Sequence, residues 1–353
     1  MNDNEIFNRM MATWQGRPLT GSADIAQLIQ ISWVSNLVYV AAELGIADLL
    51  KNGPKSIDAL ALATGSHTPS LYRVMRALAG FGIFAEVDQR CFEITPIAQC
   101  LTSDAPDSLR ALARFCGGIS YQLWGNLLHS VKTGETAFQH LFGMGFFDFL
   151  MNPQNAELGR SFGETLIAVW KLYFSSVATA YDFSKAHKVV DVGGNLGLMI
   201  ESILRAYPDL QGVLFDLPPV VEQAQQRLTA VGLADRCQVV GGNFFEAVPS
   251  GGDIYLISQV IHDWDDARSI AILQNCRRAI STQGKLLVIE MALEENNQPM
   301  FSKLTDIMML VFTGGAERTE AQYRSLFAAA GFELARVIRT NTQVNIMEGL
   351  PLA

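Results

Sequence analysis

The hydrophobic and polar positions of this 353-residue chain follow different patterns in its two halves. From Asp24 to about Leu50, apolar residues recur at helical spacing and cover much of the circumference. We therefore expect a helix that is buried on more than one side. Residues 102–160 are helix-forming and aromatic-rich, with Gly and Pro between short segments. From about Lys188, short apolar runs alternate with amphipathic segments, which is typical of strands that alternate with helices.

Between residues 56 and 95 the pattern is helix, turn, helix and hairpin. Ser56 and Gly65 fit the N-cap and the end of one helix, and Thr68, followed by Pro69, fits the start of the next. IFAEV and CFEIT, joined by a polar turn at residues 88–90, predict a short hairpin. This is the order of elements in a winged helix, which either binds DNA or serves as a packing and dimerisation module.

The charge of the chain favours the second use. Its formal net charge is -9, from 26 Lys+Arg and 35 Asp+Glu. Residues 51–100 carry basic and acidic side chains in nearly equal number, whereas general nucleic-acid binding depends on an excess of Lys and Arg that neutralises phosphates. We therefore expect no nucleic-acid partner, and a winged-helix regulator with a vestigial cofactor domain remains a minor alternative.

The second half predicts an α/β fold with a doubly wound, Rossmann-like parallel sheet and a ligand crevice at the carboxyl ends of the strands. FELARVIRT and VNIMEGL have no helix between them and predict an antiparallel strand at the edge of the sheet. We place a mostly helical winged-helix domain at 1–105, a helical linker at 106–180 and the α/β domain at 181–353.

Other features exclude several classes of protein. Five cysteines are scattered without a C-x-x-C, which indicates neither a disulfide framework nor a structural zinc site. The apolar stretch at 31–50 is interrupted by Asn36, Glu43 and Asp48, so we expect it not to span a membrane. The N-terminal residues are acidic and amide-rich where a signal peptide needs a basic start. We expect a cytoplasmic protein without a membrane partner.

The loop after the first predicted strand, DVGGNLG at 191–197, offers the first candidate chemistry. Its glycines fit the dinucleotide pattern G-x-G-x-x-G in neither register, which argues against nicotinamide or flavin. The spacing fits the first motif of class I methyltransferases, where glycines let S-adenosylmethionine approach the backbone. Asp216 ends the second strand, where it either accepts the ribose hydroxyls or caps the helix after Pro218.

Five motifs in order carry a resemblance to a known family: VVDVGGNLG, FDLPPVV, GGNFFEAVP, SQVIHDWDD and GGAERTEAQY. The chain resembles the caffeate- and hydroxyindole-type O-methyltransferases, which are dimeric and metal-free. The resemblance covers most of the chain, including the winged-helix half, which in that family is the dimerisation domain. It implies a homodimer that methylates a phenolic hydroxyl of a small aromatic secondary metabolite and converts S-adenosylmethionine to S-adenosylhomocysteine.

The resemblance also implies roles for individual residues. His262 matches the general base, and Glu290 and Glu317 match the two acids that flank and orient it. Asp263 matches a residue near the substrate oxygen. The cofactor is expected against Asp191, Gly193, Asp216, Leu217, Asn243, Phe244, Ser258 and Trp264.

Four positions depart from the family pattern. Asn195 replaces the middle glycine of the first motif but tolerates a left-handed backbone. Asn243 stands where Asp is common, and its amide oxygen can accept a hydrogen bond from the adenine amine without charge. Ser258 replaces a common lysine, which puts one cofactor contact in question. Phe312 stands where plant members often carry a substrate-binding Asn, so we expect a more apolar pocket.

A mechanism follows from these residues. Methyl transfer is an in-line displacement, and a histidine of ordinary pKa, about 6.5, is neutral enough to accept the proton of a phenol. His262 is alternatively a strand-end residue that caps the next helix. No spacing of metal ligands stands out, so we expect no metal. One group of side chains either lines an aromatic substrate pocket, to which the linker contributes, or is plain core: Phe162, Leu166, Trp170, Met308 and Phe312.

Two enzymatic alternatives remain. A histidine positioned in this way also serves a nitrogen acceptor, so N-methylation is open. Some relatives of the family have lost methyl transfer in favour of hydroxylation or decarboxylation, although His262, Glu290 and Glu317 are all present here.

Overall fold

The computed structural model describes residues 21–295 and 301–353. Contacts divide the chain into two units. The first extends to Gln122 and includes Glu164–Val169, and the second holds Leu123–Gly163 and Trp170–Ala353. Each unit has a hydrophobic core of its own. The three domains placed with boundaries at residues 105 and 180 stay a prediction.

The first unit is mainly helical. Helix α2 (Ser22–Glu43) ends before Gly45, whose left-handed backbone (φ 65°) leads into α3 (Ile46–Leu50). The single helix predicted over residues 24–50 is therefore two helices. The other elements are β1 (Lys55–Ser56), α4 (Ile57–Thr64), α5 (Thr68–Gly80), β2 (Phe84–Asp88), β3 (Cys91–Ile94), α6 (Pro96–Gln99), α7 (Arg110–Phe115) and the π-helical turn η1 (Cys116–Ser120).

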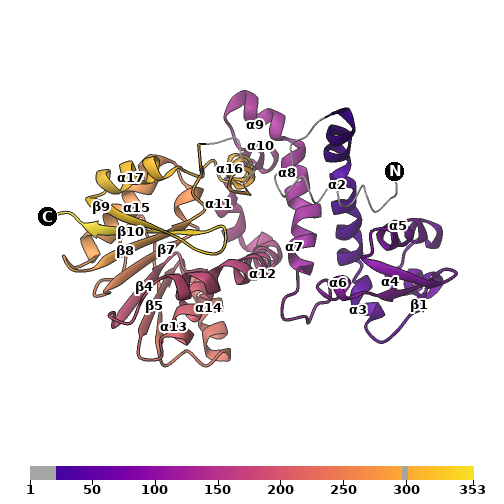
Figure 1. Ribbon diagram of the computed structural model, residues 1–353, viewed down its shortest axis with the longest axis horizontal. Coiled ribbons are helices and arrows are strands. Elements are labelled where there is room, and N and C mark those ends of the chain that lie inside the picture. The colour runs from indigo at the N-terminus through magenta and orange to yellow at the C-terminus, as the bar shows by residue number, and fades with distance from the viewer. Residues whose placement is uncertain (1–20, 296–300) are drawn as a thin grey trace. The chain divides into compact units, whose positions relative to one another are not determined.

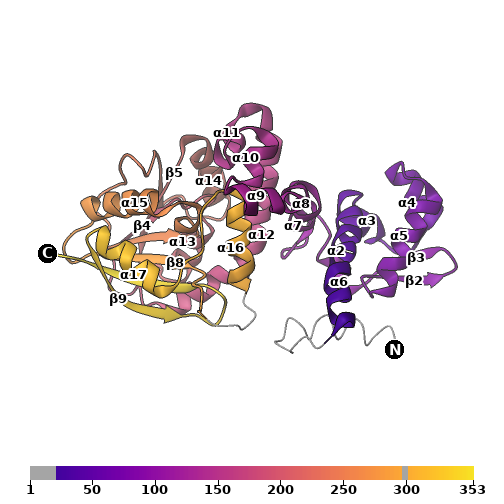
Figure 2. The ribbon, with the colours of Figure 1, turned by 90° about the horizontal axis from the view of Figure 1, so that it is seen from above.

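The helices and hairpin expected of a winged helix are present in this unit, where α4, α5 and the β2–β3 hairpin lie together (Figure 2). The Ser56 side chain caps α4 by accepting the N–H of Ala59, and Gly65 ends that helix in a left-handed conformation. Helix α5 begins one residue earlier than predicted, because His67 and not Thr68 is its N-cap. The strands form an antiparallel sheet in the order β1-β3-β2.

One apolar face of α2 is exposed in the single chain. The exposed fractions of Ile25, Ile29 and Trp33 are 52%, 69% and 64%. The expectation that this helix is buried on more than one side is therefore wrong for the chain by itself. Length and composition alone would let residues 24–43 cross a membrane, contrary to the sequence expectation, but one such helix near the N-terminus is weak evidence of a membrane segment.

The second unit contains the predicted α/β sheet, with strand order β6-β5-β4-β7-β8-β10-β9 (Figure 1). Strands β4 to β8 are parallel, and β10 is antiparallel to both of its neighbours. The antiparallel strand thus lies one position inside the edge, and β9 is outermost. The bounds are β4 (Lys188–Val192), β5 (Gln211–Asp216), β6 (Cys237–Gly241), β7 (Ile254–Ser258), β8 (Lys285–Glu290), β9 (Phe332–Arg339) and β10 (Asn345–Pro351).

Helices cover both faces of this sheet, as its apolar strands require. The C-terminal part of α12 (Ala156–Ala180) packs on one face with α13 (Leu198–Ala206) and α14 (Pro218–Ala230). Helices α15 (Asp266–Ala279) and α17 (Glu320–Ala329) pack on the other. The fold therefore leaves the carboxyl ends of the parallel strands as the place where polar side chains of several strands converge.

Short helices form the rest of the second unit. Among them, α9 and α10 contact α16, a helix that the sequence pattern did not predict. The bounds are α8 (Tyr121–Gly125), which begins in the first unit, α9 (Leu127–Thr133), α10 (Ala137–Phe142), α11 (Phe146–Met151), the 3-10 turns η2 (Pro153–Asn155) and η3 (Ile261–Asp263), and α16 (Phe301–Phe312).

Candidate active site

His262 lies in the loop that follows β7, beside the end of β8. The two strands are parallel, and Ser258 pairs with Ile289 at their carboxyl ends. The chain leaves β7 through Gln259, which adopts a left-handed backbone (φ 54°), and its N–H and side-chain amide both donate to the carbonyl of Ile289. A non-glycine residue in this conformation is strained, and such residues are often found at functional sites. It turns the loop so that His262 faces Glu290, the last residue of β8.

Two buried carboxylates meet the same nitrogen of His262. Its Nδ1 lies 3.1 Å from Glu317 Oε1, which it hydrogen-bonds, and 3.2 Å from Glu290 Oε2. Both carboxylate side chains are fully buried, and the imidazole is 8% exposed. On the other side of the ring, Asp263 Oδ1 lies 3.9 Å from Nε2. The structure thus brings together the histidine and the three acids that the sequence singled out.

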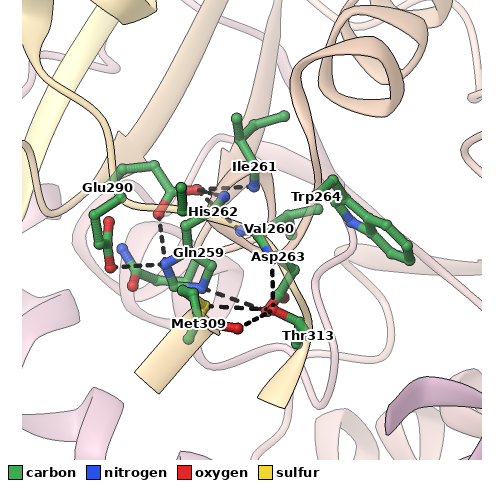
Figure 3. Close-up of polar contacts among 12 residues, drawn as sticks. Gln259, Val260, Ile261, His262, Asp263, Trp264, Glu290, Met309 and Thr313 are labelled. Atoms are coloured by element: carbon green, nitrogen blue, oxygen red, sulfur yellow. Dashed lines mark hydrogen bonds and ion pairs between the residues drawn. The ribbon is translucent and has the colours of Figure 1, made fainter. Parts of the chain in front are cut away.

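Glu290 also holds the backbone of the loop that carries His262. Its Oε1 accepts the N–H groups of Val260 at 3.1 Å, Ile261 at 2.9 Å and His262 at 3.4 Å (Figure 3). Glu317 instead forms the aligned hydrogen bond to the imidazole. The two acids therefore differ in role: Glu290 orients the loop and Glu317 orients the ring.

The carbonyl groups of the same loop are held by Arg318, which the sequence did not single out. Its guanidinium is almost fully buried and donates to the carbonyl oxygens of Ile261 at 3.1 Å and Trp264 at 2.7 Å. It also pairs with Asp266 at 2.9 Å. The loop that carries His262 is thus fixed by a carboxylate on its N–H groups and by a guanidinium on its carbonyl groups. A buried cation that satisfies several carbonyl groups is costly to remove.

Gly315 lets a second segment pack directly on this loop. A Cβ at Gly315 would overlap the carbonyl oxygen of His262 and the backbone of Asp263. The close approach requires glycine at this position. It brings the segment with Glu317 and Arg318 onto the histidine, and the N–H of Glu317 is held by Asp306 Oδ1 at 2.9 Å.

The electrostatics of the cluster favour a protonated histidine. Burial alone would lower the pKa of His262, but the negative charges of Glu290, Glu317 and Asp263 outweigh it and raise that pKa above its ordinary value. The sequence-based assumption of a pKa near 6.5 is therefore wrong for this environment. Burial raises the pKa of Glu290 as well, and Glu317 and Asp263 add to the rise while the charge of His262 opposes it.

The alternatives left open for His262 and Asp216 are not what the structure shows. Helix α15 is capped by Asp265, whose side chain accepts the N–H of Arg268, and not by His262. The N-cap of α14 is Leu217, with no side-chain cap. The carboxylate of Asp216 instead accepts the N–H of Asn195 at 2.8 Å and that of Leu217 itself at 2.7 Å.

The loop after β4 has the backbone that a close ligand requires. Gly193, Asn195 and Gly197 all have positive φ, so Asn195 does adopt the left-handed conformation expected of it. A Cβ at Gly193 would lie 2.8 Å from Cγ2 of Val260. Each oxygen of Asp216 receives one backbone N–H and keeps a lone pair for a ribose hydroxyl. These residues fit S-adenosylmethionine.

Asp191, one of the predicted cofactor residues, is fully buried beneath this loop. A Cβ at Gly194 would meet its carboxylate at 2.8 Å, and neither of its oxygens has a hydrogen-bond partner among the described residues. Burial, together with the charge of Asp216, raises the pKa of Asp191 to about 7. The geometry is that of a residue that supports the glycine loop.

The remaining cofactor candidates are placed as follows. Asn243 donates to Glu246 at 3.1 Å and accepts the N–H of Phe245 at 3.0 Å, which leaves its oxygen one further lone pair. The carbonyl of Phe244 accepts the side-chain amide of Asn275 at 2.7 Å. The hydroxyl of Ser258 is buried and has no partner among the residues described.

Trp264 is enclosed by aromatic rings. It stacks on Phe147 at a centroid distance of 5.3 Å, meets Phe245 edge-on at 4.9 Å and lies under the guanidinium of Arg268 at 5.5 Å. Its backbone carbonyl accepts a hydrogen bond from Arg318. The position of this indole is therefore fixed through the same loop that carries His262.

The structure brings together two of the five proposed pocket residues. Phe162 and Phe312 both meet Phe146 edge-on, at centroid distances of 5.0 and 5.4 Å. Phe146 was noted in the sequence only as part of an aromatic-rich stretch. Met308 is partly buried on α16, and Trp170 stacks on Phe174 at 5.2 Å. Leu166 belongs to the segment of α12 that is grouped with the first unit.

Comparisons with known proteins assign the family. The profile of the O-methyltransferase domain matches residues 124–333, and that of the O-methyltransferase dimerisation domain matches residues 26–104. The chain belongs to the O-methyltransferase family. It is an S-adenosylmethionine-dependent enzyme, and solved relatives contain S-adenosylmethionine or S-adenosylhomocysteine.

Two similar proteins and one structure illustrate the relationship. The phenazine O-methyltransferase PhzM of Lysobacter antibioticus is 45% identical over 331 residues, which cover 94% of this chain and 96% of the relative. The phenazine-1-carboxylate N-methyltransferase of Pseudomonas aeruginosa is 32% identical over 320 residues, covering 91% and 94%. The crystal structure of LaPhzM matches with a TM-score of 0.91 at 44% identity, over 95% of this chain and 100% of that one.

Proposed function

We propose that this enzyme methylates the hydroxyl of a small aromatic secondary metabolite, with His262 as general base. The observation that carries the proposal is the buried cluster in which Nδ1 of His262 is held by Glu317 and lies beside Glu290. This arrangement directs Nε2 away from the two glutamates and stabilises the imidazolium that forms when a proton is accepted. Asp263, close to Nε2, would contact the substrate oxygen.

The residues of the chain would divide the work as follows. The glycine loop and Asp216 hold S-adenosylmethionine, which supplies an electrophilic methyl group. Neutral His262 accepts the hydroxyl proton at Nε2 while the oxygen attacks, and Glu317 and Glu290 stabilise the resulting cation. General bases of this kind contribute roughly 100- to 10,000-fold to a rate. Burial of the cluster excludes water from it.

The aromatic side chains support a flat, apolar acceptor. Phe146, Phe162 and Phe312 meet edge to face, and Trp264 lies in its own aromatic surroundings. The names of the relatives refer to phenazine, mitomycin, hydroxybenzoate and naphthoate substrates, all of which contain rings. We propose a hydroxylated aromatic of that size range.

A direct assay tests this proposal. A panel of hydroxylated aromatics is incubated with labelled S-adenosylmethionine, and methylated product and S-adenosylhomocysteine are measured with the wild type and His262→Ala. We expect O-methylated product that falls by about 100-fold or more in the variant. Turnover that is equal in the two proteins would refute the role of His262, and absence of any methylated product would favour a non-methylating relative.

N-methylation is the second candidate, because relatives include a phenazine-1-carboxylate N-methyltransferase and an aminoriboflavin N,N-dimethyltransferase. A ring nitrogen that carries no proton needs no base. Matched pairs of aromatic phenols and amines in the same assay separate the two reactions. N-methylation that is unaffected by His262→Ala would replace the first proposal.

We propose that the enzyme needs no metal. The ligand atoms of His262, Glu290 and Glu317 do lie within 4.8 Å of one another, close enough for a cation. However, Nδ1 of His262 is already hydrogen-bonded to Glu317 Oε1, and Glu290 Oε1 accepts three backbone N–H groups. Activity should survive dialysis against EDTA, and loss of activity that zinc or magnesium restores would contradict this proposal.

We also propose a homodimer. The O-methyltransferase dimerisation domain matches residues 26–104 of this chain, a range that includes all of α2 but its first turn. The exposed side chains Ile25, Ile29 and Trp33 form an apolar face on this helix. A second copy of the chain is the simplest cover for such a face. No nucleic-acid partner and a cytoplasmic location stay predictions from the sequence.

A further inference from the structure

A second cluster of metal-ligating side chains lies outside the active-site cluster, on the pair of helices α9 and α10. It consists of His129 on α9, Glu135 in the connection and His140 on α10. One ligand atom from each residue lies within 4.8 Å of the other two. Helices α9 and α10 are neighbours in both views of the molecule (Figures 1 and 2).

The connection between the two helices is rigidly built. Gly134 ends α9 in a left-handed conformation (φ 76°), and its N–H donates to the carbonyl of Ser130. Thr136 caps α10 by accepting the N–H of Gln139 at 3.0 Å. Glu135 stands between these two caps, and its own N–H donates to Thr133 Oγ1 at 3.1 Å. These contacts therefore fix the backbone on both sides of Glu135.

The three side chains are in mutual contact. The His129 and His140 rings stack at a centroid distance of 3.7 Å with 18° between their planes. His129 Nε2 lies 2.9 Å from Glu135 Oε2, and the two side chains are 24% and 40% exposed.

We propose that His129, Glu135 and His140 bind a divalent cation of the zinc class. Two imidazoles with one carboxylate suit zinc, whereas magnesium and calcium prefer oxygen ligands. Because a metal lies near the plane of each imidazole, the two rings turn out of their stack on binding. The His129–Glu135 contact then opens to about 3.3 Å, the ligand spacing of a tetrahedral zinc site. Partial exposure leaves the fourth position to water.

The proposed site would act as a clamp on the α9–α10 pair. Both helices contact α16, and the methyl group of Thr136, next to Glu135, lies 3.2 Å from the position of a Cβ on Gly314. A cation that joins the two helices therefore stabilises the folded state by mass action. It contributes no group to the reaction, so we expect zinc to raise the melting temperature without being needed for turnover.

Zinc titration of the full-length protein tests the proposal. The protein is freed of metal with EDTA, dialysed and titrated with zinc chloride by calorimetry and against a chromophoric chelator. We expect one zinc ion per chain with micromolar affinity, no heat with magnesium, and a melting temperature that rises with zinc. His129→Ala and His140→Ala should each weaken binding by at least about tenfold, and Glu135→Gln by somewhat less.

Two controls make the outcome decisive. His67→Ala removes an exposed histidine whose ring contacts Ser70 Oγ, and it should leave zinc binding unchanged. His262→Ala removes the histidine of the active-site cluster, and this variant should still bind zinc. Far-UV circular dichroism confirms that each variant is folded. A wild-type protein that binds no zinc, or binding lost in His262→Ala but kept in His129→Ala, overturns the proposal.

Discussion

At the residue scale, the charge of His262 is set by acids that come from three segments of the chain. Glu290 ends β8, Glu317 follows α16, and Asp263 is the next residue in the loop. Because these acids raise the pKa of His262 above its ordinary value, the neutral form that accepts a proton becomes more abundant as pH rises. We expect kcat to increase with pH through that raised pKa and to fall as pH drops below it.

Glu317→Gln should shift this pH profile. Removal of one negative charge next to Nδ1 destabilises the imidazolium, so the pKa of His262 falls and the acid limb of the kcat profile moves to lower pH. The plateau should also fall, by roughly 10- to 100-fold, because the ring is less well oriented and less basic. Glu320→Gln, an exposed neighbour paired with Arg324, is the matched control. A lower plateau with an unmoved acid limb would show that Glu317 does not tune the histidine.

Arg318→Met should disturb both cofactor binding and the position of His262. The substitution removes the charged donor from the carbonyls of Ile261 and Trp264 and leaves them the longer contact with Ser269 Oγ, at 3.3 Å to each. We expect a loss of about 1–3 kcal/mol in unfolding free energy. Because the loop carries both Trp264 and His262, we expect weaker cofactor binding together with a lower kcat. Denaturant unfolding and cofactor titration measure the two effects. Arg324→Met, at a more exposed guanidinium, should change neither by a comparable amount.

Gly315→Ala introduces a single methyl group at a position already occupied by the backbone of residues 262–264. We expect kcat to fall by roughly 100-fold, because even a displacement of about 1 Å in the reacting groups lowers the rate strongly. The overall fold should survive, because the loop can move. Gly80→Ala is the control, since a Cβ there meets nothing within 4 Å and its backbone is not left-handed. Equal activity of the two variants would mean that the close approach at Gly315 is unimportant.

At the element scale, the strand ends explain what the sequence could and could not predict. Parallel strands with polar residues at their carboxyl ends indicated that His262, Glu290 and Asp216 lie along one edge. Glu317 follows no strand of the sheet, so only the family resemblance pointed to it. Arg318 and Gly315 carried no signal of their own, because their roles arise from backbone groups that the fold brings to them.

Burial was the property least accessible from the sequence pattern. Asp191 was assigned to the cofactor from its place in the glycine motif, yet it lies beneath the loop. The apolar periodicity of α2 indicated burial without saying what buries it, and the structure shows an exposed face. In both cases the sequence pattern indicates that a residue matters for the fold. Only the tertiary structure shows whether that residue is buried and against which segment.

At the scale of the whole molecule, the apolar face of α2 is the proposed dimer interface. Ile29→Asp together with Trp33→Asp places charge in the centre of the proposed dimer face. We expect the dimer to dissociate to monomers because unpaired buried charges are costly at an interface. Sedimentation velocity measures the change. Leu62→Asp, at a side chain that is 87% exposed, is the control. A double variant that remains dimeric would place the interface elsewhere.

The position of β10 has a consequence for the way the protein is made. Residues 345–351 pair with β8 on one side and with β9 on the other, and Asn345 lies opposite Glu290. During translation, the unpaired edge of β8 stays open until residues 345–351 have emerged from the ribosome. An exposed edge of this kind recruits other chains. The sheet is therefore completed only after β10 has been made, and copies that terminate before residue 345 would be prone to aggregate.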